Sequence, residues 1–66
     1  MELLLSRHAK EQMIDRGFSK GEVEESIRKG TKNIQNGKII STYRDYKVVY
    51  KMINETYFVI TIMYRW

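Results

Sequence analysis

The dipeptide Asn36-Gly37 is the strongest constraint on the fold of this chain, because it predicts a tight β-hairpin near the middle of the sequence. Asparagine and glycine tolerate the positive φ angles that a two-residue hairpin turn requires. The turn would join a strand over residues 32–35 to a strand over residues 38–43. Arg44-Asp45 and Asn54-Glu55 are the next candidate turns, and they delimit strands over residues 46–53 and 56–64. The second half of the chain is therefore predicted to form antiparallel strands.

The start of the chain has the pattern of a short amphipathic helix. Ser6 is a suitable N-cap, and Ala9, Met13 and Ile14 recur at helical spacing. Gly17 then supplies the residue at which helices commonly end. These signals predict a helix near residues 7–16.

A second helix is predicted directly after the first. Ser19 and Glu22 form a Ser-x-x-Glu capping box, in which the serine caps the backbone and the glutamate reaches back to it. Val23 and Ile27 supply an apolar stripe, and Gly30 marks the end of the helix. We therefore expect a helix near residues 20–29.

The order of these elements predicts an α+β fold in a single domain that spans residues 1–66. We expect two helices packed on one face of an antiparallel sheet of three to four strands, with a short strand over residues 2–5 completing the sheet. A chain of this size buries only ~60% of its unfolded surface, so the core is small. The chain has no cysteine, which excludes a disulfide framework and a thiolate metal site.

The register of the last two strands can be predicted from the distribution of apolar residues. A slip of one residue would turn every side chain to the other face. We favour the register that pairs Met52 with Phe58, Tyr50 with Ile60, Val48 with Ile62 and Tyr46 with Tyr64. This register places Phe58 and Ile60 in the core, and it adds Ile34, Ile39 and Tyr43 to the same face. It requires a three-residue turn over residues 54–56, whereas a two-residue turn would place Lys47 and Lys51 on the face of Phe58, Ile60 and Ile62.

The excess of basic residues lies mostly in the second half of the chain. The whole chain carries a net charge of +4. The opposite face of the predicted sheet gathers Lys38, Thr42, Lys47, Lys51, Thr61 and Arg65 around Ile40, Val49, Val59 and Met63. Such a face suits the neutralisation of a phosphate backbone. The alternative is a solvated face whose lysines maintain solubility and discourage edge pairing. The candidate nucleic-acid-binding residues are Lys38, Arg44, Lys47 and Lys51.

Catalytic candidates come from the histidine and the tyrosines. His8 is the single histidine, and on a helix it shares one side with Gln12, Asp15 and Arg16, away from Ala9 and Met13. It would serve as a general acid or base in RNA cleavage, with Arg16 binding an anion. The alternative is a surface histidine near a helix end. Five tyrosines occur between residues 43 and 64, and Tyr64 beside Arg65 is the one that we separate from the core.

The sequence also argues against several classes of function. No Gly-rich phosphate loop, paired carboxylates on the strands or metal-ligand spacing is present, so we expect no metal and no cofactor. The first residues have an acid where a signal peptide has a base, and the apolar run over residues 57–64 is far shorter than the ~20 residues of a membrane span. We therefore expect a cytoplasmic protein without a membrane partner.

A family resemblance adds to this reading. Residues 6–19 read SRHAKEQMIDRGFS, and residues 22–27 read EVEESI before Gly30. This pattern resembles a bacterial and archaeal family of small domains of unknown function, which in turn is similar to the RelE/ParE-like toxins and related metal-independent ribonucleases. The resemblance covers nearly the whole chain and implies the RelE-like order of strand, helix, helix and sheet.

Three functions that differ in class remain open, and the resemblance implies the first of them. The first is a toxin-like, RNA-targeting protein, as an endoribonuclease neutralised by an antitoxin, with His8, Arg16, Tyr64 and Arg65 as catalytic residues. The second is a non-catalytic module that binds RNA or the ribosome through the basic face. The third is a partner-binding domain without enzymatic activity. We expect a monomer or a small oligomer in each case.

Overall fold

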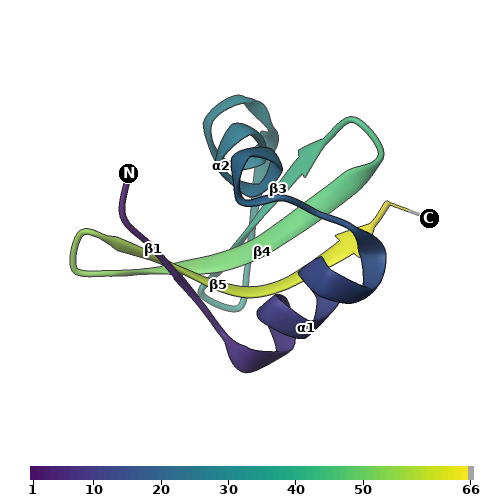
Figure 1. Cartoon of the computed structure of the whole chain (residues 1–66). Coiled ribbons are helices and arrows are strands. Elements are labelled where there is room, and N and C mark those ends of the chain that lie inside the picture. The colour runs from purple at the N-terminus through teal and green to yellow at the C-terminus, as the bar shows by residue number, and fades with distance from the viewer. Residues whose placement is uncertain (66) are drawn as a thin grey trace.

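The computed structural model describes residues 1–65 and shows two helices packed against a five-stranded mixed sheet (Figure 1). The strands lie in the order β1-β5-β4-β3-β2. Strand β1 runs parallel to β5, and the remaining neighbours are antiparallel. The elements are β1 (Leu3–Leu5), α1 (Arg7–Arg16), α2 (Lys20–Lys29), β2 (Thr31–Gln35), β3 (Lys38–Tyr43), β4 (Tyr46–Ile53) and β5 (Thr56–Tyr64). The predicted α+β class, with its N-terminal strand, is confirmed.

Both helices begin and end where the sequence predicts. The Ser6 hydroxyl accepts a hydrogen bond from the amide of Ala9 at 3.0 Å, and Gly17 ends α1 in the left-handed region with φ 75°. At the start of α2, the amide of Glu22 donates to the Ser19 hydroxyl at 3.1 Å, while the amide of Ser19 donates to the Glu22 carboxylate at 2.8 Å. The capping box therefore forms in both directions.

The hairpin turns are also close to prediction. Asn36 and Gly37 both have positive φ, at 52° and 76°, as a type I′ turn requires. The turn after β3 contains Arg44, which has a φ of 56° although it is not glycine. The last turn holds Asn54-Glu55, because Ile53 pairs with Thr56. The prediction of a three-residue turn at this point is wrong.

The pairing of β4 with β5 is correct in one half and shifted in the other. Tyr46 pairs with Tyr64 and Val48 with Ile62, as predicted. The register then shifts between Val49 and Tyr50, so that Tyr50 pairs with Val59 and Met52 with Tyr57 instead of Ile60 and Phe58. The extra residue is a β-bulge at Ile60. It allows a two-residue turn and yet keeps Lys47 and Lys51 on the face opposite the core.

The bulge changes which residues form the core. Val59 and Ile62 are fully buried together with Val23 and Val48, whereas Phe58 and Ile60 are half-buried. The prediction that Phe58 and Ile60 are core residues is therefore wrong. The prediction that Val59 lies on the face of the sheet opposite the helices, which we call the open face, is also wrong. Phe58 pairs with Lys51 and therefore lies on the open face in place of Val59. Ile39 and Tyr43 pack against the core as expected, but Ile34 is 73% exposed.

Helix α2 is joined to the sheet by a reciprocal pair of buried serines. The Ser26 hydroxyl donates to the Ser41 carbonyl at 3.1 Å, and the Ser41 hydroxyl donates to the Ser26 carbonyl at 2.5 Å. Both side chains are fully buried, so leaving either hydroxyl without a hydrogen-bond partner between α2 and β3 would lower the free energy of unfolding. A Cβ at Gly30 would meet the Ser41 hydroxyl and the carbonyl of Ser26, so only glycine allows this close approach.

Replacing Ile62 with alanine should lower the free energy of unfolding by about 2–5 kcal/mol, because its side chain is fully buried and the small core cannot refill the cavity. Ile60→Ala should cost clearly less, since the bulged Ile60 is half-buried. Urea denaturation followed by circular dichroism measures both. An Ile60→Ala loss as large as that of Ile62→Ala would contradict the observed register.

Candidate functional site

Helix α1 is held along the edge of β5 by hydrogen bonds that replace a neighbouring strand. Strand β1 pairs only with residues 57–59 of β5. Beyond that point, the Ser6 hydroxyl donates to the Ile60 carbonyl at 2.7 Å. The Gln12 side-chain oxygen accepts from the amide of Ile62 at 2.9 Å and from the Thr61 hydroxyl at 2.5 Å. The sequence placed Gln12 on a solvent side, and its spacing carried no signal for this contact.

This docking brings the end of α1 to the end of β5. The Arg16 guanidinium carbon lies 5.9 Å from the centre of the Tyr64 ring, within the range of a cation–π interaction. The Tyr64 hydroxyl donates to the Arg16 carbonyl at 3.3 Å. Two of the predicted catalytic residues, 48 positions apart in sequence, are therefore neighbours in the structure.

Tyr64 begins a row of four aromatic rings that crosses the molecule. Its ring lies 5.2 Å from that of Phe18, which lies 5.2 Å from that of Tyr46. Tyr46 in turn meets Tyr43 edge to face at 6.2 Å. We call Tyr64, Phe18, Tyr46 and Tyr43 the aromatic row. Phe18 and Tyr46 are buried, so the middle of the row is core and its two ends approach the surface.

The far end of the row carries a second arginine. The Arg44 guanidinium carbon lies 5.1 Å from the centre of the Tyr43 ring, and one of its nitrogens lies 3.9 Å from the Glu25 carboxylate. This ion pair is exposed and weak, so Arg44 remains available to another anion. A third arginine joins it, because the Arg65 guanidinium donates to the Arg44 carbonyl at 3.1 Å. Arg16 and Tyr64 at one end of the aromatic row, and Arg44 and Arg65 at the other, are together called the arginine cluster.

Tyr46 is a structural member of the row. Burial raises its pKa to about 12, with the nearby carboxylates of Glu22 and Glu25 acting in the same direction. Its hydroxyl donates to the Glu22 carbonyl at 2.7 Å, a bond that requires the protonated phenol. Burial also raises the pKa of Tyr50, which packs on Tyr57 at 5.6 Å. Neither phenol is suited to act as a base.

Except for Lys47, the other predicted site residues lie apart from the arginine cluster. His8 is exposed near the start of α1, about 12 Å along the helix axis from Arg16. Lys47 is half-buried and pairs with Met63, so it shares the open face with Arg65. Lys51 lies about 13 Å further along β4. Lys38 is exposed at the start of β3, at the same distant end of the sheet.

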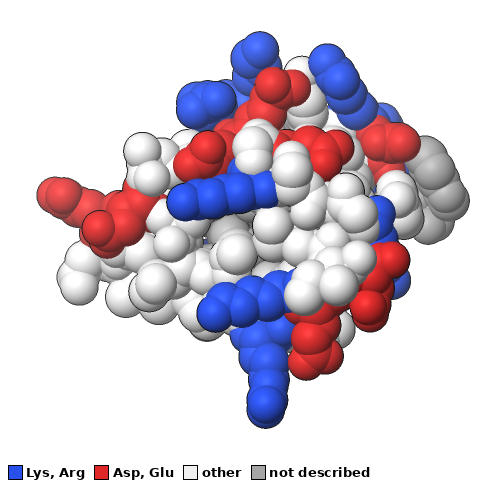
Figure 2. All heavy atoms as spheres, in the orientation of Figure 1, with Lys and Arg blue, Asp and Glu red and all other residues white. Residues whose placement is uncertain are grey.

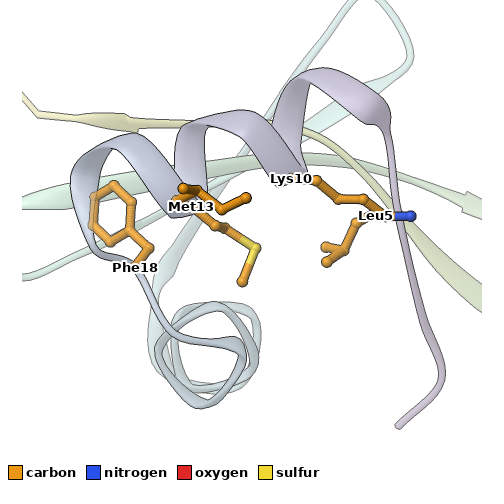
Figure 3. Close-up of a pocket in the computed structure, with 5 residues that line it drawn as sticks. Leu5, Lys10, Met13 and Phe18 are labelled. Carbon is orange, nitrogen blue, oxygen red and sulfur yellow. The ribbon is translucent and has the colours of Figure 1, made fainter.

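The side of the molecule that carries the helices is not uniformly basic. Figure 2 shows acidic and basic side chains interspersed around a largely uncharged middle. A shallow groove of about 540 Å³ lies beside α1 and is lined by Leu5, Lys10, Met13, Ile14 and Phe18 (Figure 3). One lysine among four apolar side chains offers no acid–base pair, so this groove does not carry the chemistry of a catalytic site.

The arginine cluster offers positive charge that can bind an anion. Three exposed guanidinium groups offer fixed positive charge and bidentate hydrogen bonds, which suit a phosphate. Within residues 1–65, no group of His, Asp or Glu side chains is placed to hold a metal ion. Each helix in this part of the chain has ten residues, and neither is long or apolar enough to cross a bilayer.

Comparisons with known proteins agree with this fold. Residues 5–64 match the family described as Domain of unknown function (DUF4258), so the chain belongs to that family. The fold is similar to that of a chain in the crystal structure of the toxin–antitoxin complex RelBE2 from Mycobacterium tuberculosis, with a TM-score of 0.62 and 14% identity over 97% of this chain and 96% of that chain. At this identity the likeness concerns the fold. No curated protein matches the chain.

Replacing Gln12 with leucine should destabilise the protein by about 1–3 kcal/mol, because the Ile62 amide loses its acceptor at a half-buried edge. Hydrogen exchange of the Ile62 amide should accelerate as well. Glu11→Leu is the matched control, since Glu11 is exposed on the same helix. Equal exchange of the Ile62 amide in the two variants would show that Gln12 does not hold this edge.

The raised pKa of Tyr46 predicts a loss of stability at alkaline pH. The neutral phenol is favoured in the folded state, so its contribution is complete below pH 10 and is lost as the pH rises towards about 12. Over this range, the free energy of unfolding of the wild type should fall by about 2 kcal/mol more than that of Tyr46→Phe, which cannot ionise at this position. Urea denaturation of both proteins at several pH values measures the difference. Parallel curves would contradict the prediction.

Proposed function

We propose that this protein is a toxin-like RNA-binding protein whose arginine cluster binds phosphates of the RNA backbone. The observation that carries the proposal is the placement of three arginines along the aromatic row, with Arg16 over the Tyr64 ring, Arg44 over the Tyr43 ring and Arg65 bonded to the Arg44 carbonyl. Arg16 ends α1, Arg44 lies in the turn between β3 and β4, and Arg65 follows β5. The likeness to the fold of a chain in a toxin–antitoxin complex supports the same class.

The open face extends this site along the sheet. Lys47 stands beside Arg65 on this face, and Lys51 and Lys38 lie at its distant end. In the proposal, a single strand of RNA runs from the arginine cluster along this line of lysine side chains. Phosphate contacts of this kind bind all sequences alike, because they carry no base information.

The cluster also supports a metal-independent cleavage step. The ribose 2′-oxygen would attack the adjacent phosphorus and lose its proton to a water molecule, while the 5′-oxygen leaves and takes up a proton. The products are a 2′,3′-cyclic phosphate and a 5′-hydroxyl. Arginines stabilise the negative charge that develops on the phosphorane. We propose that Tyr64 donates a proton to the leaving 5′-oxygen. Because His8 lies far from Arg16, we propose that it contacts a neighbouring nucleotide.

The proposal includes a protein partner. The similar fold belongs to a chain of a toxin–antitoxin complex, and we propose that an antitoxin-like protein neutralises this chain. A partner that covers the arginine cluster, or that holds α1 away from β5, would suppress RNA binding.

Reversing the charge of Lys47 and Arg65 to glutamate should abolish most RNA binding. If three or four phosphates are neutralised, the affinity of wild type for single-stranded RNA should fall with salt at a logarithmic slope of roughly −2 to −3. The matched control is Arg7→Glu with Lys20→Glu, which changes the net charge equally at two exposed first positions of helices, where glutamate is favourable. Filter binding at several salt concentrations measures both pairs.

Incubation of RNA with the protein, alone and with ribosomes, tests the catalytic part. Cleavage should persist in EDTA and should fall strongly for Tyr64→Phe, which keeps the ring and removes the hydroxyl. Binding without cleavage would favour the non-catalytic module. Equal RNA affinity in the two charge-reversed pairs would contradict an RNA site at the arginine cluster.

A further inference from the structure

Strand β2 is an open edge of the sheet. It lies last in the strand order and pairs only with β3 among the described residues. All five of its residues are exposed, and Ile34 keeps 73% of its surface although it lies on the side that carries the helices. An edge of this kind offers unpaired backbone groups to another extended chain.

The hairpin turn determines which backbone groups of β2 point outward. In a two-residue hairpin, the residues that flank the turn form a hydrogen-bonded pair, which here is Gln35 with Lys38. Hydrogen-bonded and open pairs alternate along an antiparallel ladder. Asn33 therefore bonds inward to β3, while Lys32 and Ile34 direct their amides and carbonyls away from the sheet. This edge can accept one strand without losing any bond of its own.

The charge around this edge has a single sign. Between Glu25 and Asp45 the chain carries five basic residues and no acidic residue, a local charge that exceeds the net +4 of the whole chain. The five residues are Arg28, Lys29, Lys32, Lys38 and Arg44. Four of them lie in β2 or within three residues of either end of it, and all four are exposed. A strand that pairs here would meet positive charge at both ends.

We propose that β2 is a docking edge for an extended acidic segment of a partner protein, which adds a sixth strand to the sheet. Backbone hydrogen bonds to Lys32 and Ile34 would supply affinity, and an apolar side chain opposite Ile34 would cover its exposed surface. A second copy of this chain does not fit, because pairing two such edges would bring like charges together. RNA would leave the outward backbone groups and Ile34 without complementary partners.

This inference rests on the proposed function only in expecting a protein partner. Strand β2 is separated from β5 by β3 and β4, so about 14 Å lies between this edge and the strand that carries Tyr64. Lys38 contributes charge to both sites, but Ile34→Pro changes no residue of the RNA site, so the two sites can fail independently. RNA binding tests the arginine cluster, and peptide binding tests the β2 edge.

The experiment titrates ¹⁵N-labelled protein with a synthetic seven-residue peptide of alternating glutamate and valine, with blocked ends. The amides of Lys32 and Ile34 should shift and exchange with solvent about tenfold more slowly, whereas the amide of Asn33 should not gain protection because it already bonds to β3. A peptide with lysine in place of glutamate should bind at least tenfold more weakly. A peptide N-methylated on its central residues should lose binding, and this control needs no change to the protein.

Ile34→Pro is the matching variant of the protein. Proline removes the outward amide and none of the bonds to β3, so the fold should persist and peptide binding should fall about tenfold. Ile34→Ala keeps the amide and should retain protection at that position. Absence of protection at Lys32 and Ile34 with millimolar peptide would overturn the proposal and leave the lysines as a means of repelling other strands. Retained RNA binding by Ile34→Pro would show that the arginine cluster is intact.

Discussion

The edge of β5 is the constraint on which this structure depends. Strand β1 is only three residues long, so the C-terminal half of β5 would expose its backbone if nothing else satisfied it. Ser6 and Gln12 fill that role with side-chain hydrogen bonds to residues 60–62. Since unpaired backbone groups at a buried edge are costly, these bonds fix the position of α1 along β5. The position of α1 in turn determines where Arg16 and Phe18 lie.

The aromatic row connects the position of α1 to the surface, because Phe18 packs between Tyr46 and Tyr64. Its two central rings belong to the hydrophobic core, and each outer ring lies under an arginine, Arg16 at one end and Arg44 at the other. The site therefore does not rest on a flexible loop, because the same ring contacts that stabilise the domain hold two guanidinium groups in place. Arg44 adds a conformational cost, since its positive φ is unfavourable for a residue with a side chain. Backbone strain of this kind is concentrated at functional positions in proteins.

Much of the fold could be predicted because its signals are local. The caps at Ser6 and Ser19 and the Asn36-Gly37 turn each act within a few residues, and the structure confirms all three. The bulge at Ile60 could not be predicted, because it arises from a conflict between a short turn and the distribution of charges across two strands. The site was predicted only as separate residues. The sequence pointed to Arg16, Tyr64 and Arg65, but the contact between Arg16 and Tyr64 depends on Gln12, whose partners lie about 50 positions away. His8 was grouped with Arg16 on one helix side, and helix geometry places the two at opposite ends of α1.

The central claim is that the arginine cluster, and not the positive charge of the surface as a whole, binds RNA. The chain contains five arginines, so the side-chain NεH signals in an NMR titration with a short single-stranded RNA compare the cluster with its own internal controls. The account predicts that the signals of Arg16, Arg44 and Arg65 shift in a saturable way, while those of Arg7 and Arg28 stay in place. Equal shifts of all five signals, or shifts confined to Arg7 and Arg28, would contradict it.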